Sequence, residues 1–391
     1  MEIKTVMLVK YGEIALRKGN RAFFEHNLLD AIRHNLREHK LKVSREQGRF
    51  LIEDPGGDVN IEEVLPKIQH IFGLTSFCIA GKTTAMDIKD LRPLALNFIS
   101  NHCKGKKTFK VNTKRSDKQY PLLSGEVSAE IGEEIFESDL GLTVDLHNPD
   151  IILWVELRNS TYFYIESIIG EGGLPYKTSG KGVLLLSGGF DSPVAGYLAA
   201  RRGVEIVCIY FHSPPFVSER AEDKVKDLAR ELTKFTGKIK LCVIPFTDVQ
   251  LFLKEETRPE KLTIFLKRAM LHIASALAEK ENAGCLITGD SVGQVASQTI
   301  QSLAAVNSAA KFTVLRPLSI MDKQEIIDIA HKIGTYPISV RPYDDCCTLF
   351  VAKHPENKPN ANAIEKIESY IMPRLQPLLE NALENAEYVS V

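Results

Sequence analysis

The chain has 391 residues, 49 Lys and Arg against 50 Asp and Glu, and a formal net charge of −1. This length exceeds the about 250–300 residues that one hydrophobic core usually serves, so we expect two or three domains. A hydrophobic share of 44% and a charged share of 25% are typical of an ordinary globular protein. No apolar run approaches the roughly 20 residues that span a bilayer, and the N-terminal segment has no signal-peptide layout. We therefore expect a cytoplasmic protein with no membrane partner.

The first part of the chain mixes strands and helices without strict alternation, which predicts an α+β fold. Turn signals such as the cluster of Asp, Pro and Gly at 54–58 separate its segments. We expect strands at 5–9, 41–43, 49–53, 108–112, 151–157 and 161–167, and helices at 22–38, 61–68 and 125–136.

A glycine-rich stretch at 170–182 is typical of a linker. After it, strands and helices alternate strictly, which predicts a doubly wound parallel sheet whose ligands bind beyond the carboxyl ends of the strands. We expect strands at 183–186, 204–211, 239–245, 285–288 and 313–316, with helices such as 218–236 and 262–279 between them.

The segment 183–193, VLLLSGGFDSP, is the most informative feature of the chain. Four apolar residues predict a buried strand, and the small apolar residues after the turn predict a helix with Ser192 as N-cap and Pro193 as its first residue. Gly188 and Gly189 let backbone N–H groups approach an anion at the helix N-terminus. The turn lacks the Lys-Ser/Thr of a Walker A loop, and its SGGxDS form resembles the PP-loop of the N-type ATP pyrophosphatases.

Further candidates follow the other strands. Tyr210 and Phe211 could stack on or flank adenine, or could be ordinary core aromatics. Gly289 would allow close approach of a nucleotide, and Asp290 could hold Mg²⁺ together with Asp191. Arg268 is a candidate partner for phosphates or a plain surface residue, and Lys323 opens the helix after the fifth strand, at the same edge of the sheet.

Seven cysteines are scattered along the chain, and no CxxC pair suggests zinc, so we assign no metal-ligand cysteines. Cys208, Cys242 and Cys285 fall in apolar strand-like segments and are expected to be structural thiols. The adjacent pair Cys346 and Cys347 lies in a polar stretch, where preceding carboxylates argue against a strongly activated thiolate. A persulfide on Cys346 would be more acidic and would need less activation.

A basic run lies in the first half of the chain. It comprises Lys104, Lys106, Lys107, Lys110, Lys114, Arg115 and Lys118, against Asp117 alone. Such a run can contact nucleic-acid phosphates, or it can be a solvated face, and charge alone does not separate the two.

These motifs together resemble the tRNA 4-thiouridine synthetase family, whose members are also called tRNA sulfurtransferases or thiamine-biosynthesis sulfurtransferases. The resemblance covers essentially the whole chain. It rests on KYGEIALRKGNR (10–21), GGLPYKTSGK (172–181), LLLSGGFDSPVA (184–195), YFHSPPF (210–216), TGDSVGQVASQT (288–299), LRPLSIMDKQEII (315–327) and RPYDDCC (341–347).

The resemblance implies an N-terminal ferredoxin-like domain at 1–59, a THUMP domain at 60–168 that binds tRNA, a linker at 169–182 and a PP-loop ATP pyrophosphatase domain at 183–391. It implies an ATP- and Mg²⁺-dependent enzyme that adenylates O4 of uridine 8 in tRNA and transfers persulfide sulfur to give 4-thiouridine. The basic run falls in the THUMP-like region, which favours RNA contact.

The resemblance also implies site residues, residue by residue. Asp191 and Lys323 take the adenylation roles, and Cys346 bears or resolves the persulfide. ATP contacts fall on Leu185, Leu186, Tyr210, Phe211, Arg268, Gly289 and Gln298, beside the loop of Ser187, Gly188, Gly189, Asp191 and Ser192.

Some family members continue into a rhodanese-like domain, which this sequence does not show, so a separate cysteine desulfurase is the expected sulfur donor. The family also implies sulfur donation to a small sulfur-carrier protein for thiamine synthesis. A homodimer is expected because the RNA-binding and PP-loop regions must address well-separated sites on one tRNA.

Two rival functions share parts of the pattern. An amide-forming or lysidine-forming ATP pyrophosphatase would keep the PP-loop but would have no use for Cys346. A non-catalytic RNA-binding protein that merely senses nucleotide would retain function without Asp191.

Overall fold

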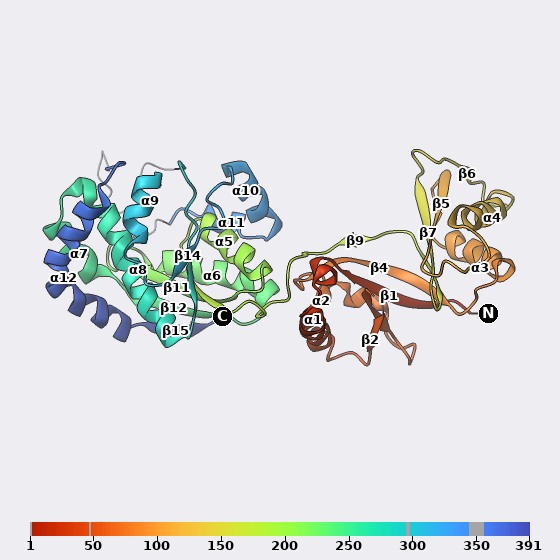
Figure 1. Ribbon diagram of the computed structural model, residues 1–391, viewed down its shortest axis with the longest axis horizontal. Coiled ribbons are helices and arrows are strands. Elements are labelled where there is room, and N and C mark those ends of the chain that lie inside the picture. The colour runs from red at the N-terminus through yellow and green to blue at the C-terminus, as the bar shows by residue number, and fades with distance from the viewer. Residues whose placement is uncertain (1, 47, 295–297, 344–355) are drawn as a thin grey trace. The chain divides into compact units, whose positions relative to one another are not determined.

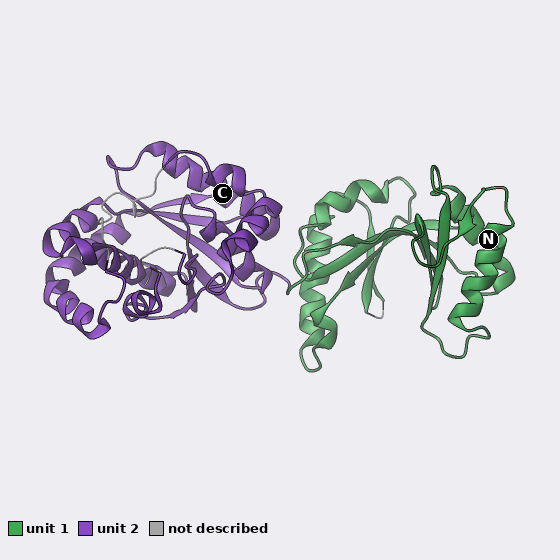
Figure 2. Ribbon diagram, turned by 90° about the horizontal axis from the view of Figure 1, so that it is seen from above, with its two compact units in different colours: residues 1–173 green, residues 174–391 purple. Residues whose placement is uncertain are grey.

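The protein consists of two units, residues 1–173 and 174–391, which are coloured separately in Figure 2. The structure is a computed structural model that describes residues 2–46, 48–294, 298–343 and 356–391. The finer domain boundaries given above stay a prediction.

The first unit is built on one mixed nine-stranded sheet with the order β2-β3-β1-β4-β8-β7-β5-β6, and β9 pairs with β4. The expected strands and helices are present, and the 61–68 segment forms a 3₁₀ turn that runs into a short helix. The long central strand β4 overlaps a strand-like segment at 71–79 of the sequence. The strands are β1 (Lys4–Tyr11), β2 (Lys42–Glu46), β3 (Arg49–Glu53), β4 (Leu74–Thr83), β5 (Thr108–Arg115), β6 (Thr143–Val144), β7 (Ile151–Leu157), β8 (Thr161–Tyr164) and β9 (Ile168–Ile169).

Helices pack on this sheet through apolar residues spaced one turn apart. They are α1 (Arg21–Asn35), α2 (Leu65–Ile68), α3 (Ile88–Ser100) and α4 (Ser124–Phe136), with 3₁₀ turns η1 (Glu13–Leu16) and η2 (Ile61–Val64). In α3, Leu91, Ala95 and Ile99 recur every four residues and are fully buried. They share a core cluster with alternate residues of β5 and β7, which follows from the two-residue period of a strand.

The second unit confirms the predicted doubly wound sheet. Its six strands have the order β14-β13-β10-β11-β12-β15, and all neighbours are parallel except β15, which pairs antiparallel with β12. The sequence reading did not predict β15. The strands are β10 (Lys181–Leu185), β11 (Glu205–His212), β12 (Lys240–Pro245), β13 (Cys285–Ile287), β14 (Thr313–Leu315) and β15 (Glu387–Ser390).

Helices cover both faces of this sheet (Figure 1). One layer contains α5 (Asp191–Arg201), α6 (Glu219–Thr236), α10 (Lys323–Lys332) and α11 (Tyr336–Ser339), and the other contains α7 (Thr247–Glu256), α8 (Leu262–Lys280), α9 (Ile300–Asn307) and α12 (Ala361–Glu384), with a 3₁₀ turn η3 (Pro259–Lys261) before α8. No helix in the described part of the chain is long and apolar enough to cross a membrane.

The start of α5 differs from the sequence prediction. Phe190 is the N-cap residue, with φ −81° and ψ −17°, so the helix begins at Asp191 and Pro193 is its third residue. The Ser192 hydroxyl does not cap the helix, because it turns back to accept a hydrogen bond from the Ser187 backbone N–H at 2.8 Å. The chain enters helical geometry directly after the two glycines, which makes the loop tighter than predicted.

A buried ion pair joins α8 to α12. Arg268 is 2% exposed and Glu368 is 6% exposed, and the guanidinium binds the carboxylate through both Nε and Nη2. His272 lies 3.2 Å from the same carboxylate. Burial raises the pKa of Glu368, but the hydrogen bonds and charges of His272 and Arg268 outweigh it and lower the pKa to about 2.

We predict that Glu368→Gln destabilises the protein by about 3 kcal/mol at neutral pH, since breaking a buried pair leaves the Arg268 charge uncompensated. A depressed pKa in the folded state contributes stability above the ordinary carboxyl pKa and loses it on acidification. The free energy of unfolding of the unsubstituted protein should therefore fall between about pH 5 and pH 2 more steeply than that of the variant.

Urea unfolding followed by circular dichroism at several pH values measures this difference. Glu365→Gln, an exposed change on the same helix, is the matched control and should leave the curve nearly unchanged. Equal curves for the two variants would contradict a stabilising role for the pair.

Candidate active site

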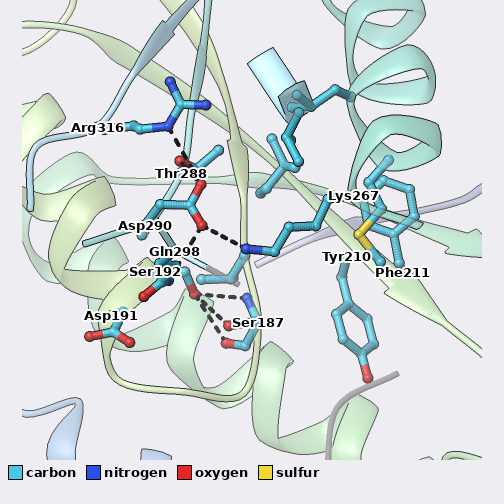
Figure 3. Close-up of a pocket in the computed structure, with 16 residues that line it drawn as sticks. Ser187, Asp191, Ser192, Tyr210, Phe211, Lys267, Thr288, Asp290, Gln298 and Arg316 are labelled. Carbon is cyan, nitrogen blue, oxygen red and sulfur yellow. Dashed lines mark hydrogen bonds and ion pairs between the residues drawn. The ribbon is translucent and has the colours of Figure 1, made fainter. Parts of the chain in front are cut away.

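A pocket opens at the carboxyl edge of the second sheet, where the strand order reverses. Strands β11 and β12 follow β10 on one side, whereas β13 and β14 lie on its other side. Ligands of doubly wound folds bind at such a switch point. The hollow has a volume of about 210 Å³. Its walls are formed by Leu185, Leu186, Ser187, Asp191, Ser192, Tyr210, Phe211, Lys267, Met270, Leu271, Thr288, Gly289, Asp290, Gln298, Val306 and Arg316 (Figure 3).

Most of the predicted nucleotide contacts meet in this pocket. They come from the ends of β10 and β11, from the start of α5 and from the segment after β13, and they are Leu185, Leu186, Ser187, Asp191, Ser192, Tyr210, Phe211, Gly289 and Gln298. Gly188 and Gly189 lie in the turn between Ser187 and α5. The contact of these residues with ATP stays a prediction.

The wall is apolar on one side and polar on the other. Phe211 packs edge-on against Phe246, with ring centroids 5.0 Å apart, and Tyr210 is 2% exposed. Met270 and Leu271 of α8 continue the apolar side. Such a surface fits a flat aromatic ring, while the Ser187 to Ser192 side offers hydroxyl and backbone donors.

Asp191 is the carboxylate at the start of α5. Burial raises its pKa and so does the charge of Asp290, whereas a hydrogen bond from Gln294 and the charge of Lys323 act in the opposite direction. The Gln294 amide nitrogen lies 3.3 Å from one carboxylate oxygen and 3.5 Å from the other. Lys323 is exposed at the first position of α10, which Asp322 caps by accepting from two backbone N–H groups. Lys323 is not among the residues that line the pocket, but it is close enough for its charge to lower the pKa of Asp191. Its role in adenylation stays a prediction.

Asp290 is held by four neighbours. Its carboxylate accepts hydrogen bonds from Lys267 Nζ at 3.0 Å, Thr288 Oγ1 at 2.9 Å and Gln298 Nε2 at 3.4 Å. Arg316 Nε lies 3.6 Å from its second oxygen. Burial alone would raise the pKa of this carboxyl, but Lys267, Thr288 and Arg316 lower it to about 2. Figure 3 shows Lys267 reaching from α8 to this carboxylate.

The prediction that Asp290 shares a magnesium ion with Asp191 does not fit this arrangement. Each Asp290 oxygen already has a cation beside it and a neutral donor. A divalent ion would meet two like charges there. Asp191 keeps a carboxylate with only a weak amide contact and is the group that fits magnesium.

The assignment of Arg268 to the phosphates is not supported by the structure. Its guanidinium is engaged by Glu368, the Ala305 carbonyl and the Ser308 hydroxyl, away from the pocket wall. Lys267, one position earlier, lines the pocket instead. Adjacent helical residues point about 100° apart, so a shift of one position selects a different partner.

Position 289 has no room for a side chain, because neighbouring backbone lies too close. A Cβ placed there would lie 2.7 Å from the backbone nitrogen of Ser192 and 2.8 Å from the carbonyl carbon of Asp191. The loop after β13 therefore packs directly against the start of α5. The sequence reading attributed this glycine to the approach of a nucleotide, whereas the close neighbour in the structure is the PP-loop helix.

Lys267 and Arg316 are pocket residues that the sequence reading did not identify. Arg316 follows β14 directly, and the rule that ligands bind beyond strand ends could have selected it. Lys267 lies within a helix whose neighbouring positions are mostly apolar and buried, and nothing local distinguishes it from Arg268.

Cys346 and its neighbour Cys347 lie outside the described residues. Burial raises the pKa of the Cys208 thiol to about 12 and that of the Cys242 thiol to about 11. Cys285 is partly buried, and burial raises its pKa too. These strand thiols are poor nucleophiles, in line with the expectation that they are structural.

The residues of the basic run lie in three different local environments of the first unit. Lys104, Lys106 and Lys107 are exposed in the loop before β5. On β5, the Lys110 ammonium donates to the Leu146 carbonyl, and the Lys114 ammonium lies 4.8 Å above the Trp154 ring. Separately, Arg115 donates to the backbone carbonyls of Lys118 and Tyr120 and so holds its own loop.

Known protein families match three successive parts of the chain. Residues 177–372 match the family described as thiamine biosynthesis protein (ThiI), residues 6–78 match the ThiI ferredoxin-like domain, and residues 85–166 match the THUMP domain. The predicted fold class, a ferredoxin-like and THUMP half followed by a PP-loop α/β domain, is confirmed.

Curated relatives and solved structures point to the same family as these domain matches. The probable tRNA sulfurtransferase of Lachnoclostridium phytofermentans is 46% identical over 387 residues, which is 98% of each chain. The probable tRNA sulfurtransferase of Thermoanaerobacter pseudethanolicus is 46% identical over 367 residues, 94% of this chain and 95% of the relative. A crystal structure of a 4-thiouridine synthetase in complex with RNA and bound ATP superposes with a TM-score of 0.88 at 37% identity, covering 99% of this chain and 100% of that one. A Pyrococcus horikoshii structure, at 23% identity and a TM-score of 0.64 over 84% of this chain and 99% of that one, shares the fold. The chain therefore belongs to the tRNA sulfurtransferase family.

Proposed function

We propose that this protein converts uridine 8 of tRNA to 4-thiouridine in two steps. The O4 atom of the uracil attacks the α-phosphorus of ATP, pyrophosphate leaves, and the N3 proton is lost. The terminal sulfur of a persulfide then attacks C4, and AMP leaves. A second thiol attacks the inner sulfur, so that the S–S bond to the transferred sulfur breaks, 4-thiouridine is released and a disulfide between the two thiols remains. The observation that carries the proposal is the pocket at the switch point, in which the SGGFDS loop meets the end of β11 and the segments after β13 and β14.

The pocket residues suit the first step. The apolar wall of Phe211, Met270 and Leu271 would hold the adenine ring, and the N–H groups at the start of α5 would face the phosphates. Lys267 and the nearby Lys323 supply positive charge where negative charge develops. A magnesium ion on Asp191 would neutralise phosphate charge during the displacement.

The second step needs a sulfur carrier. We propose that Cys346 bears the persulfide, or resolves the disulfide left after transfer, and that a separate cysteine desulfurase supplies the sulfur. We also propose a homodimer acting in the cytoplasm, where a second role in sulfur donation to a small carrier protein for thiamine synthesis would be served by the same cysteine.

We predict that Asp191→Asn lowers tRNA-dependent pyrophosphate release by about 100-fold or more, because the reacting phosphates lose the carboxylate that fits magnesium. Pyrophosphate release from unmodified tRNA with ATP, Mg²⁺ and inorganic sulfide measures the first step, and nucleoside mass spectrometry of 4-thiouridine measures the second. Sulfide bypasses any missing donor.

Asp223→Asn, an exposed carboxylate change on α6, is the control and should retain full activity. Full formation of 4-thiouridine by the Asp191 variant would refute the assignment and favour an RNA-binding protein that only senses nucleotide. In a parallel test, Cys346→Ser should abolish transfer from a desulfurase, and its retained activity would favour a nitrogen-transfer enzyme.

The RNA interface is proposed on the exposed part of the basic run. Alternate β5 residues share a face, so Lys110 and Lys114 lie on the side of Trp154 and opposite the buried Phe109 and Val111. Trp154 is half-buried, and lysines beside an aromatic ring are typical of single-strand and backbone contact with RNA.

We predict that changing Lys104, Lys106 and Lys107 together to Gln weakens tRNA binding and lowers the slope of log affinity against log salt by about 2 to 3, since each lost phosphate contact removes roughly 0.7–0.9. Filter binding of tRNA across a salt series measures both quantities. An unchanged slope would remove this loop from the interface.

A matched control changes Lys234, Lys238 and Lys280 to Gln. These exposed lysines lie at or just after the ends of α6 and α8, at the edge where the parallel strands begin and opposite the pocket. The same loss of charge there should leave the slope nearly unchanged, which separates local contact from net charge.

A further inference from the structure

We propose that Asp290 is a positioning residue, which holds Lys267 and Arg316 as a pair of cations for the phosphate groups of the nucleotide and does not bind a magnesium ion. This inference rests on the proposed binding of ATP in the pocket. Asp290 resembles a magnesium ligand at first sight, since the residue before it packs against the start of α5 beside the PP-loop.

The position of Asp290 is fixed by backbone contact. The preceding residue, Gly289, packs so closely on Asp191 and Ser192 that a Cβ would approach their backbone to 2.7–2.8 Å. The following Ser291 is 4% exposed. The carboxylate therefore cannot move far from the start of α5, and any group bound to it keeps a defined place relative to the PP-loop.

Two cations converge on this one carboxylate from different elements. Lys267 reaches it from α8, with Nζ 3.0 Å from Oδ1, and Arg316 reaches it from the end of β14, with Nε 3.6 Å from Oδ2. The Lys267 side chain is 22% exposed and that of Arg316 is 15% exposed, so both are largely withdrawn from water. One carboxylate between two cations leaves an excess positive charge in the pocket wall, which suits a polyanion.

The cations retain unused donors. An ammonium has three N–H donors, and the Asp290 contact is one of them. Arg316 donates Nη1 to the Asn307 side chain at 2.9 Å, and its Nε faces Asp290 at 3.6 Å, which is beyond hydrogen-bond distance. Its buried Nη2 has no hydrogen-bond partner among the described residues. Buried guanidinium donors without a partner are costly, and phosphate oxygens are the acceptors that match them in charge and geometry.

The same contacts leave little for a metal ion. Oδ1 of Asp290 faces Lys267 and Gln298, and Oδ2 faces Thr288 and Arg316. Magnesium requires open oxygens and keeps several waters in an octahedral shell. A dication next to an ammonium and a guanidinium would displace one of them and lose the pairing that fixes the site.

The test compares Asp290→Asn, Asp290→Glu and Lys267→Gln by equilibrium dialysis of ATP at several free Mg²⁺ concentrations, without tRNA. We expect Asp290→Asn and Lys267→Gln each to weaken ATP binding by about tenfold, by the same factor at every Mg²⁺ concentration, because the cations lose their place or their charge. Asp290→Glu should restore part of the affinity. Combining the Asn and Gln changes should weaken binding by less than the product of the two factors, since they remove one shared interaction.

The Mg²⁺ requirement of tRNA-dependent pyrophosphate release gives the second readout. The apparent Mg²⁺ constant of Asp290→Asn should equal that of the unsubstituted enzyme. A severalfold rise in this constant, or rescue by Mn²⁺, would identify Asp290 as a metal ligand and overturn the proposal. Unchanged ATP affinity in both single variants would overturn it as well.

Two controls separate this inference from the proposed function and from misfolding. Asp223→Asn should bind ATP as the unsubstituted protein does. Lys267→Gln leaves the Asp290 carboxylate with Arg316 and gives an independent result if Asp290→Asn fails to fold. ATP binding without formation of 4-thiouridine would refute the proposed function and leave this inference standing, because affinity is measured without the acceptor.

Discussion

The parallel pairing of β10 with β13 is the constraint on which the candidate site depends. Gly182, Val183 and Leu184 lie opposite Cys285, Leu286 and Ile287, and a Cβ at Gly182 would approach the Cys285 sulfur to 2.7 Å. Because the two strands end side by side, the SGGFDS loop and the loop after β13 emerge at one edge of the sheet. Gly289 then closes the remaining gap against the start of α5. Segments about 100 residues apart in the sequence thereby become two walls of one pocket.

Two aspartates in this pocket have opposite electrostatic environments, and this difference assigns their roles. Burial raises the pKa of Asp191, whose direct hydrogen-bond partner in the described structure is the Gln294 amide. Asp290 instead has two cationic partners, and the charges of Lys267 and Arg316, with hydrogen bonds from Lys267 and Thr288, lower its pKa to about 2. A carboxylate with open oxygens can serve a ligand, whereas one saturated by cations orders those cations. Asp191 therefore suits the reacting groups, and Asp290 suits the proposed positioning of Lys267 and Arg316.

Sequence reasoning identified the features that depend on local pattern. The strand, glycine turn and helix around SGGFDS carry their own signals, so the PP-loop and the doubly wound sheet were predicted. The sequence pointed to Arg268 and not to Lys267, because both are basic and adjacent and nothing local distinguishes them. The packing of α12 shows that Glu368 engages Arg268, which leaves Lys267 at the pocket. Ser192 was assigned to the helix cap since Ser favours that position, but the tight turn places its hydroxyl on the Ser187 backbone. Long-range pairings such as β15 with β12 leave no local signature.

In the first unit, the sequence shows how many positively charged side chains are present but not on which face of the sheet each one lies. The two-residue period of β5 sends Phe109 and Val111 into the core, and Lys110 and Lys114 to the face of Trp154. The Arg115 guanidinium donates hydrogen bonds to backbone carbonyls of its own loop, so part of its hydrogen-bonding capacity serves the fold. In the proposed interface, a phosphate backbone would therefore meet the loop lysines and one face of the strand. The number of charges alone does not define such an interface, because a strand divides its residues between two faces and one of them packs into the core.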